Sequence, residues 1–166
     1  MQQENWSSAQ LELLEEATAL VEAAPTVEQA LAKLGELLTA RERQFGWVGF
    51  YLLRNGTLEM VARSGHDRPP HPPSVASGMG PHGLAAMRAE TVALLDLRLD
   101  PRGLACTSTS HWEIIVPIQE EGIVYGEIDV DGKGSRKPAR NDRSFLEAVA
   151  ALVASMFHTR ERRHHP

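Results

Sequence analysis

The hydrophobic pattern of this chain changes its period near residue 45, and this change constrains the fold more than any other feature. Residues 7–24 and 26–40 carry apolar side chains at every third or fourth position, which is typical of amphipathic helices. Later segments, such as 47–53 and 123–130, are short apolar or alternating runs typical of strands. A helical pattern returns over residues 142–158. The chain is therefore predicted to have an α+β fold with helices at both ends.

The predicted strands connect mostly through short turns. Asn55-Gly56 is a strong hairpin signal between strands 47–53 and 58–62, and Gly122 lies in a turn between strands 113–118 and 123–130. A further strand is predicted at 91–97 and a short helix at 83–89, with long loops at 64–82 and 98–112. Such connections favour a central antiparallel sheet, with the N-terminal and C-terminal helices packed on one face.

Length and composition limit the class of protein. The 166 residues fit a single domain, 1–166, made of two N-terminal helices (7–40), a sheet with a ligand pocket (45–132) and a C-terminal helix (142–158). A net charge of −5 argues against nucleic-acid binding. No apolar run is long enough for a membrane-spanning helix, so neither a nucleic acid nor a membrane is expected as a partner. The first ten residues have no signal-peptide pattern, so a cytoplasmic location is expected.

The single cysteine, Cys106, excludes an internal disulfide and a zinc site built on a cysteine pair. It lies in GLACTSTSHWE, a predicted loop rich in hydroxyl groups. Cys106 is either an accessible, reactive thiol or an inert structural one, and the residues around it leave both readings open. Four histidines in the two loops (His66, His71, His82 and His111) match no zinc pattern, so no metal is predicted.

Two residue pairs share a strand face by period-2 alternation. Asp129 and Asp131 end the strand GEIDVD, and burial together would raise their pKa values, so that one could act as a general acid. The alternative is that both carboxylates meet solvent or cap the next loop. Trp47 and Tyr51 share a face of an earlier strand, where core packing is the simplest explanation.

Four segments together resemble a known family: WVGFY at 47–51, GMGPHGLAA at 78–86, LACTSTSHWEIIVPI at 104–118 and GEIDVDG at 126–132. Over about residues 40–157 the chain resembles GAF domains and, more closely, the free methionine-(R)-sulfoxide reductases, which are single GAF domains. The resemblance implies a GAF-type fold, with a small-molecule pocket on the sheet face opposite the terminal helices.

The resemblance also implies roles for particular residues. Cys106 falls on the cysteine that attacks the sulfoxide sulfur, and Glu113, Asp129 and Asp131 fall on carboxylates that bind the substrate amine and help to protonate the departing oxygen. Trp47 and Tyr51 fall on aromatic residues that hold the methyl end of the substrate. The implied activity is a thiol-dependent reduction of free L-methionine-(R)-sulfoxide that needs no cofactor.

The chain departs from the family at the cysteines that regenerate the enzyme. His82 stands at one of these positions and His71-Pro72 at the other. Regeneration of Cys106 would need an external thiol, such as a small thiol or a redoxin protein, or a Cys106–Cys106 homodimer. The alternative is a non-catalytic GAF module that binds or senses a small ligand. His82 either lowers the pKa of Cys106 as an imidazolium or points to solvent.

Overall fold

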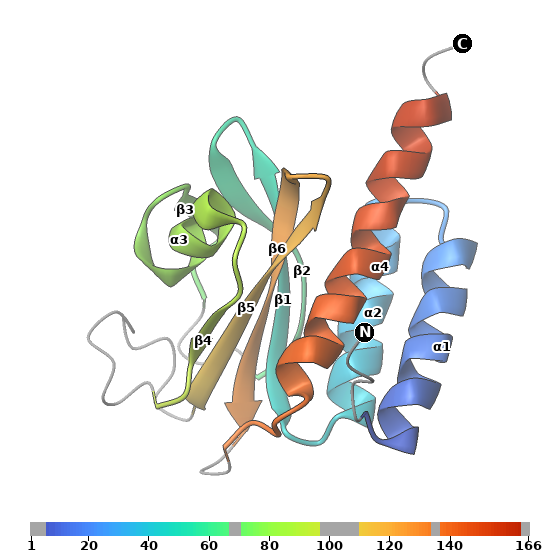
Figure 1. The fold of residues 1–166 in the computed structure, drawn as a ribbon, viewed down its shortest axis with the longest axis vertical. Coiled ribbons are helices and arrows are strands. Elements are labelled where there is room, and N and C mark those ends of the chain that lie inside the picture. Colours follow the sequence, from blue (N-terminus) through green and yellow to red (C-terminus); the bar gives the residue numbers. More distant parts are fainter. Residues whose placement is uncertain (1–5, 67–70, 97–109, 134–136, 164–166) are drawn as a thin grey trace.

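The computed structural model describes residues 6–66, 71–96, 110–133 and 137–163. Helices α1 (Ser8–Ala23), α2 (Val27–Arg41) and α4 (Asp142–Arg163) lie on one side of a curled sheet, and α3 (Gly80–Arg88) lies on the other (Figure 1). The expected α+β arrangement, with helices from both ends of the chain on one face, is confirmed. Within the described residues, no helix combines the length and apolarity needed to span a membrane.

The sheet has six strands in the order β3-β2-β1-β6-β5-β4, and every neighbouring pair is antiparallel. The strands are β1 (Phe45–Arg54), β2 (Thr57–Gly65), β3 (Ser74–Ala76), β4 (Val92–Leu94), β5 (Ser110–Glu120) and β6 (Ile123–Lys133). Asn55 and Gly56 form the predicted hairpin turn with φ angles of 50° and 78°, as a tight two-residue turn requires. The predicted antiparallel sheet is therefore confirmed.

Several predicted boundaries were wrong. The loop predicted over 64–82 contains β3 and the first turn of α3, and the strand predicted over 91–97 has only three residues. Both short strands lie at the edges of the sheet, where three residues give too little alternation to be detected in a sequence. Strand β6 continues to Lys133, so Asp131 lies within a strand rather than at its end, and α4 continues to Arg163.

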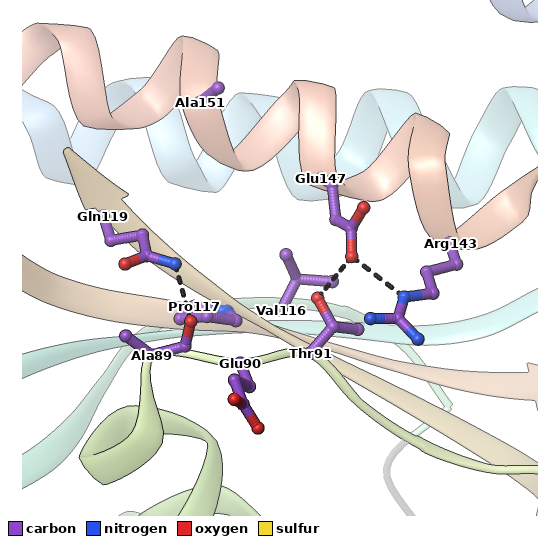
Figure 2. A pocket seen from close by; sticks show the side chains of 9 residues that line it. All are labelled: Ala89, Glu90, Thr91, Val116, Pro117, Gln119, Arg143, Glu147 and Ala151. Carbon is purple, nitrogen blue, oxygen red and sulfur yellow. Dashed lines mark hydrogen bonds and ion pairs between the residues drawn. The ribbon is translucent and has the colours of Figure 1, made fainter. Parts of the chain in front are cut away.

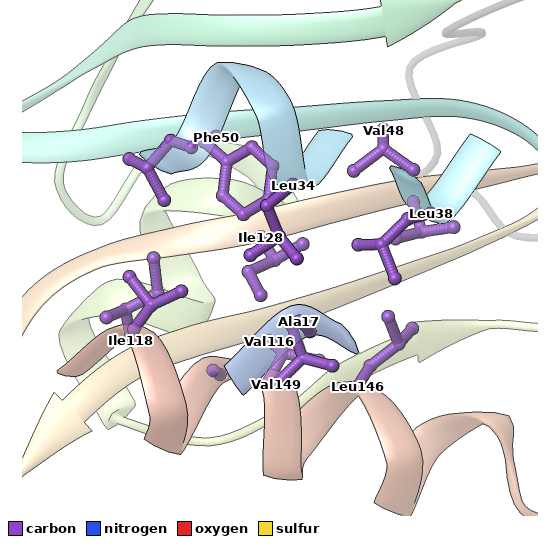
Figure 3. Packing of buried hydrophobic residues seen from close by; sticks show 14 of the residues in the cluster. Ala17, Leu34, Leu38, Val48, Phe50, Val116, Ile118, Ile128, Leu146 and Val149 are labelled. Atoms are coloured by element: carbon purple, nitrogen blue, oxygen red, sulfur yellow. The ribbon is translucent and has the colours of Figure 1, made fainter. Parts of the chain in front are cut away.

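The main core lies between the sheet and the helical layer. Apolar side chains of α2 and α4 pack against one face of the central strands (Figure 3). The helical residues are Leu34, Leu38, Leu146 and Val149, and the strand residues are Val48, Phe50, Val116, Ile118 and Ile128. The N-cap of α1 is Ser7, whose hydroxyl accepts from the backbone of Gln10 while the Gln10 side chain accepts from the Ser7 backbone. Because apolar side chains fill this face, polar residues that alternate with them point to the opposite face.

Candidate functional site

The face of the sheet opposite α1, α2 and α4 carries a buried row of acidic side chains. Glu127, Asp129 and Asp131 alternate along β6 with the core residues Ile128 and Val130. Glu113 of β5 lies directly opposite Asp131 in the antiparallel register. All four carboxyl groups belong to residues with no exposed surface. The strand register therefore brings four acidic side chains together as a carboxylate cluster (Glu113, Glu127, Asp129 and Asp131).

Strand β1 lines the other side of the carboxylate cluster with aromatic rings. Trp47 pairs with Asp131, Gly49 with Asp129, and Tyr51 with Glu127. The Trp47 ring lies over Gly49, where an added Cβ would come within 2.1 Å of the ring atom Cη2. The glycine therefore lets the indole lie flat on the strand beside the acidic row.

Helix α3 brings His82 over the cluster. The His82 side chain is 6% exposed, and its Nδ1 lies 2.5 Å from Glu127 Oε1. The other ring nitrogen, Nε2, lies 3.5 Å from Asp129 Oδ2 and 3.6 Å from Glu113 Oε1. The alternative in which His82 points to solvent is therefore wrong. Residue 83 is glycine, at which a Cβ would lie 2.5 Å from the carbonyl oxygen of Ala76, so this residue lets α3 pack closely against the end of β3.

A second histidine, His71, enters the same site ahead of β3. Its ring is stacked on the Trp47 indole with centroids 3.6 Å apart and planes 4° from parallel. Its Nε2 lies 3.0 Å from Asp131 Oδ2. The Tyr51 hydroxyl donates to the carbonyl oxygen of Pro72 at 2.9 Å and so helps to fix this segment. Both histidines that the resemblance assigns to cysteine positions of the sulfoxide reductases thus lie in the site.

Burial and mutual repulsion shift the ionisation of the cluster toward neutral carboxyls. Burial, followed by the charge of Asp131, raises the pKa of Glu113 to about 7. Burial and then the charges of Glu113, Asp131 and Glu127 raise the pKa of Asp129 well above its ordinary value. Burial would lower the pKa of His82, but the hydrogen bond and charge of Glu127, with the charge of Glu113, raise it. The site therefore holds protons at pH values where exposed carboxyls would have lost them.

The structure brings together six of the seven residues predicted for the site: Trp47, Tyr51, His82, Glu113, Asp129 and Asp131. The seventh, Cys106, lies outside the described residues. Sequence reasoning missed His71 and Glu127 as members of the site. Glu127 was detectable, since it continues the same period-2 alternation as Asp129 and Asp131.

Two groups of side chains in the site have the composition of metal ligands, although no metal was predicted. One consists of His82, Glu113 and Asp129, and the other of His71, Asp129 and Asp131. In each group the potential ligand atoms lie within 4.8 Å of one another. Neutral imidazole and carboxylate are ordinary ligands for divalent transition metals.

A separate hollow lies at the edge of the sheet, between β5, the segment that joins α3 to β4, and α4 (Figure 2). Its central charged group is Glu147, which accepts from Thr91 Oγ1 at 2.6 Å and from Arg143 Nε at 2.9 Å. Gln119 Nε2 donates to the carbonyl oxygen of Ala89 at 2.8 Å. These hydrogen bonds connect the edge of the sheet to α4. Because the polar groups of the hollow bind one another, a structural role is favoured for them.

Comparison with known proteins finds similarity to GAF proteins and to free methionine-R-sulfoxide reductases. No family model matches the chain. It is 28% identical over 125 residues to the GAF domain-containing protein A of Dictyostelium discoideum, covering 74% of this chain and 78% of that protein. It is 26% identical over 129 residues to the free methionine-R-sulfoxide reductase of Escherichia coli K12, covering 78% and 76%.

The likeness extends to three dimensions. The structure of the free methionine-R-sulfoxide reductase of Neisseria meningitidis, in complex with its substrate, superposes with a TM-score of 0.82. The two chains are 25% identical, and the match covers 95% of each. The chain therefore has the GAF-domain fold and is homologous, at modest identity, to the free methionine-R-sulfoxide reductases.

Proposed function

We propose that this protein reduces free L-methionine-(R)-sulfoxide to methionine, with Cys106 as the nucleophile and an external thiol as the reductant. Homology to the reductases of Escherichia coli and Neisseria meningitidis supports the reaction class. The observation that carries the proposal is the buried carboxylate cluster facing Trp47 and Tyr51. The substrate has a cationic amine at one end and a methyl sulfoxide at the other. The carboxylate cluster suits the amine, and the aromatic rings of Trp47 and Tyr51 suit the methyl group.

The raised pKa values give the cluster a role in the chemistry. A sulfoxide oxygen leaves poorly until it is protonated, so the reaction needs an acid that still holds its proton near neutral pH. Glu113, whose pKa burial raises to about 7, and Asp129, whose pKa is raised well above its ordinary value by burial and then by its charged neighbours, have this property. Within the cluster, neutral carboxyls serve as proton donors and ionised ones bind the substrate amine.

The proposed reaction reduces the substrate sulfur and oxidises Cys106 by two electrons. The Cys106 thiolate attacks the sulfoxide sulfur and forms an S–S bond, while the oxygen, protonated by the neutral carboxyls, leaves as water. A water molecule then attacks the Cys106 sulfur, the S–S bond breaks, and the products are methionine and a Cys106 sulfenic acid. The substrate sulfur gains two electrons and the cysteine sulfur loses two. Two equivalents of an external thiol then restore the Cys106 thiol, releasing water and a disulfide.

An external reductant follows from the cysteine count. The chain has one cysteine, so a sulfenic acid on Cys106 has no second thiol in the same chain with which to condense. A small thiol, a redoxin protein or Cys106 of a second chain could supply the reducing sulfur. The proposal assigns this role to a small thiol or redoxin, because either regenerates Cys106 without requiring two sites to meet.

A second candidate, a non-catalytic ligand-binding GAF module, is favoured by the position of His71. Its imidazole covers the Trp47 ring at a centroid distance of 3.6 Å and lies against Asp131. Trp47 is one of the two aromatic residues expected to hold the methyl end of a methionine sulfoxide, and His71 occupies one face of its ring. A protein that no longer needs this face free could have become a sensor for a smaller ligand.

Methionine release distinguishes the two candidates. The purified protein is incubated with each sulfoxide epimer and excess dithiothreitol, and free methionine is measured for the wild type and Cys106→Ser. The reductase predicts methionine from the R epimer with the wild type and none with the variant. Absence of turnover by the wild type, together with stabilisation by an amino acid, would support the binding module instead.

A further inference from the structure

The carboxylate cluster contains an imidazole nitrogen whose surroundings suit a cation. His82 Nδ1 lies 2.5 Å from Glu127 Oε1, and a ring N–H at this position donates to the carboxylate. Metal binding needs the neutral ring, in which the proton is on Nδ1 and the remaining nitrogen, Nε2, has a lone pair directed toward Asp129 and Glu113. Among the described residues, the buried His82 Nε2 has no hydrogen-bond partner. Buried polar atoms without partners are costly unless something else satisfies them.

The separations around His82 Nε2 are those expected of atoms that share a metal ion. Bonds of about 2.0–2.2 Å in a tetrahedral arrangement place neighbouring ligand atoms about 3.3–3.6 Å apart. The observed distances from Nε2 are 3.5 Å to Asp129 Oδ2 and 3.6 Å to Glu113 Oε1. Both exceed the usual N–H···O range of about 2.7–3.2 Å, so a shared cation fits the geometry better than direct hydrogen bonds.

Glu127 supplies the outer support that metal-bound histidines usually have. A ligating imidazole typically donates its other N–H to a carboxylate or carbonyl, which fixes the tautomer and the ring orientation. The Glu127–His82 contact has this form, and Glu127 itself is fully buried. The Tyr51 ring, with its centroid 5.2 Å from that of His82, packs on the imidazole and further limits its rotation.

We propose that His82 Nε2, Glu113 and Asp129 bind one divalent transition-metal ion of the zinc type. The nitrogen ligand favours such an ion over Mg²⁺ or Ca²⁺, which prefer oxygen ligands throughout. Three protein ligands leave a further coordination position for water or a small ligand. The ion neutralises the buried carboxylates and occupies the part of the cluster to which the substrate amine is assigned, so the ion and the amino acid compete.

The neighbouring histidine provides a contrast within the same cluster. His71 Nε2 lies 3.0 Å from Asp131 Oδ2, which is within hydrogen-bonding distance, so this contact needs no ion between its atoms. The proposed ligands therefore include His82 and exclude His71. A variant at each position tests the assignment.

The experiment measures Zn²⁺ binding to metal-free protein by isothermal titration calorimetry. All titrations use the Cys106→Ser chain, which removes the thiol as an alternative zinc ligand and also removes the proposed reductase activity. The expected result is one Zn²⁺ per chain. His82→Gln should weaken binding at least about 100-fold, and Glu127→Gln, which keeps every proposed ligand, should weaken it about 10–100-fold.

Two histidine variants serve as matched controls. His158 Nδ1 lies 3.7 Å from Glu120 Oε2 at the surface. His158→Gln therefore removes a histidine that is paired with a carboxylate outside the site. Its zinc affinity, and that of His71→Asn, should stay within a few-fold of the parent chain. Circular dichroism and thermal unfolding without metal establish that each variant is folded.

Several results would overturn the proposal. They are the absence of stoichiometric binding, binding that persists in the folded His82→Gln chain, and binding lost in His158→Gln or His71→Asn but kept in His82→Gln. Because the readout is binding in a chain that lacks the cysteine, failure of the metal site leaves the reductase proposal intact. A failed reductase assay likewise leaves the metal site untouched.

Discussion

Replacing Gly49 by alanine should destabilise the protein by disrupting the aromatic side of the site. A Cβ at this position would lie 2.1, 2.6 and 2.8 Å from three atoms of the Trp47 ring, where contacts below 3.0 Å essentially never occur. The ring cannot simply lift away from the strand, because the His71 imidazole is stacked on it with centroids 3.6 Å apart. Trp47 is also 1% exposed, so no solvent gap can absorb the shift.

The magnitude follows from two contributions. Forcing an extra methyl group into a packed interior costs about 1–3 kcal/mol. Loss of the stacked geometry between Trp47 and His71 adds about 0.5–1.5 kcal/mol. The sum of about 2–4 kcal/mol corresponds to a Tm lowered by about 5–15 °C for a chain of this length.

Urea and thermal unfolding of Gly49→Ala, with Gly35→Ala as the matched control, measure this cost. A Cβ at Gly35 would lie 3.5 Å from its nearest neighbours, which is ordinary contact, and Gly35 is inside α2. Alanine is favoured over glycine in a helix by about 0.5–1 kcal/mol, so the control should equal or exceed the wild type in stability. A Gly49→Ala protein that unfolds at the wild-type temperature with an unchanged m-value would refute the reasoning about Trp47.

Three further predictions concern ionisation and ligands. Burial raises the pKa of Glu113 from 4.5 to about 7, so the free energy of unfolding of the wild type should fall as pH rises between these values. Glu113→Gln removes the buried charge, so it should raise the free energy of unfolding at pH 8 by about 1–3 kcal/mol while lowering turnover. Urea unfolding at pH 5 and pH 8 checks this, and equal effects of the variant at both values would contradict it. If the His82 imidazolium lies near the Cys106 thiol, His82→Ala should move the pH profile of thiol alkylation to higher pH, and an unchanged profile would reject that pairing. Methionine at about 100 times its Kd should raise the free energy of unfolding by about 2.7 kcal/mol, seen as a higher Tm that Asp129→Asn abolishes.

The sequence predicted those parts of the site that depend on alternation within one strand. Period-2 spacing placed Asp129 with Asp131 and Trp47 with Tyr51 on shared faces, and both placements hold in the sheet. That rule is local, so it needs no knowledge of the partner strands. The helices and the hairpin at Asn55-Gly56 were also predicted, because helical periodicity and turn residues are likewise local patterns.

The remaining features depend on contacts between distant segments. The position of Glu113 opposite Asp131 follows from the register of β5 and β6, which includes irregular pairing between Ser110 and Glu113. The burial of His82 requires α3 to close over the sheet, and the placement of His71 depends on stacking against Trp47. No pattern within these segments shows that their histidines face carboxylates, so sequence reasoning left them in loops.

The central claim is that Cys106 removes oxygen from methionine-(R)-sulfoxide, and a single-turnover experiment tests it most directly. The protein, reduced and freed of all added thiol, is mixed with excess R epimer without oxygen, and both methionine and the mass of the protein are measured. With one cysteine per chain, the account predicts one methionine per chain, no second turnover and a gain of one oxygen atom at Cys106. A disulfide-linked dimer with one methionine per two chains would instead indicate regeneration between two copies. No methionine, with Cys106 still a free thiol, would contradict the account.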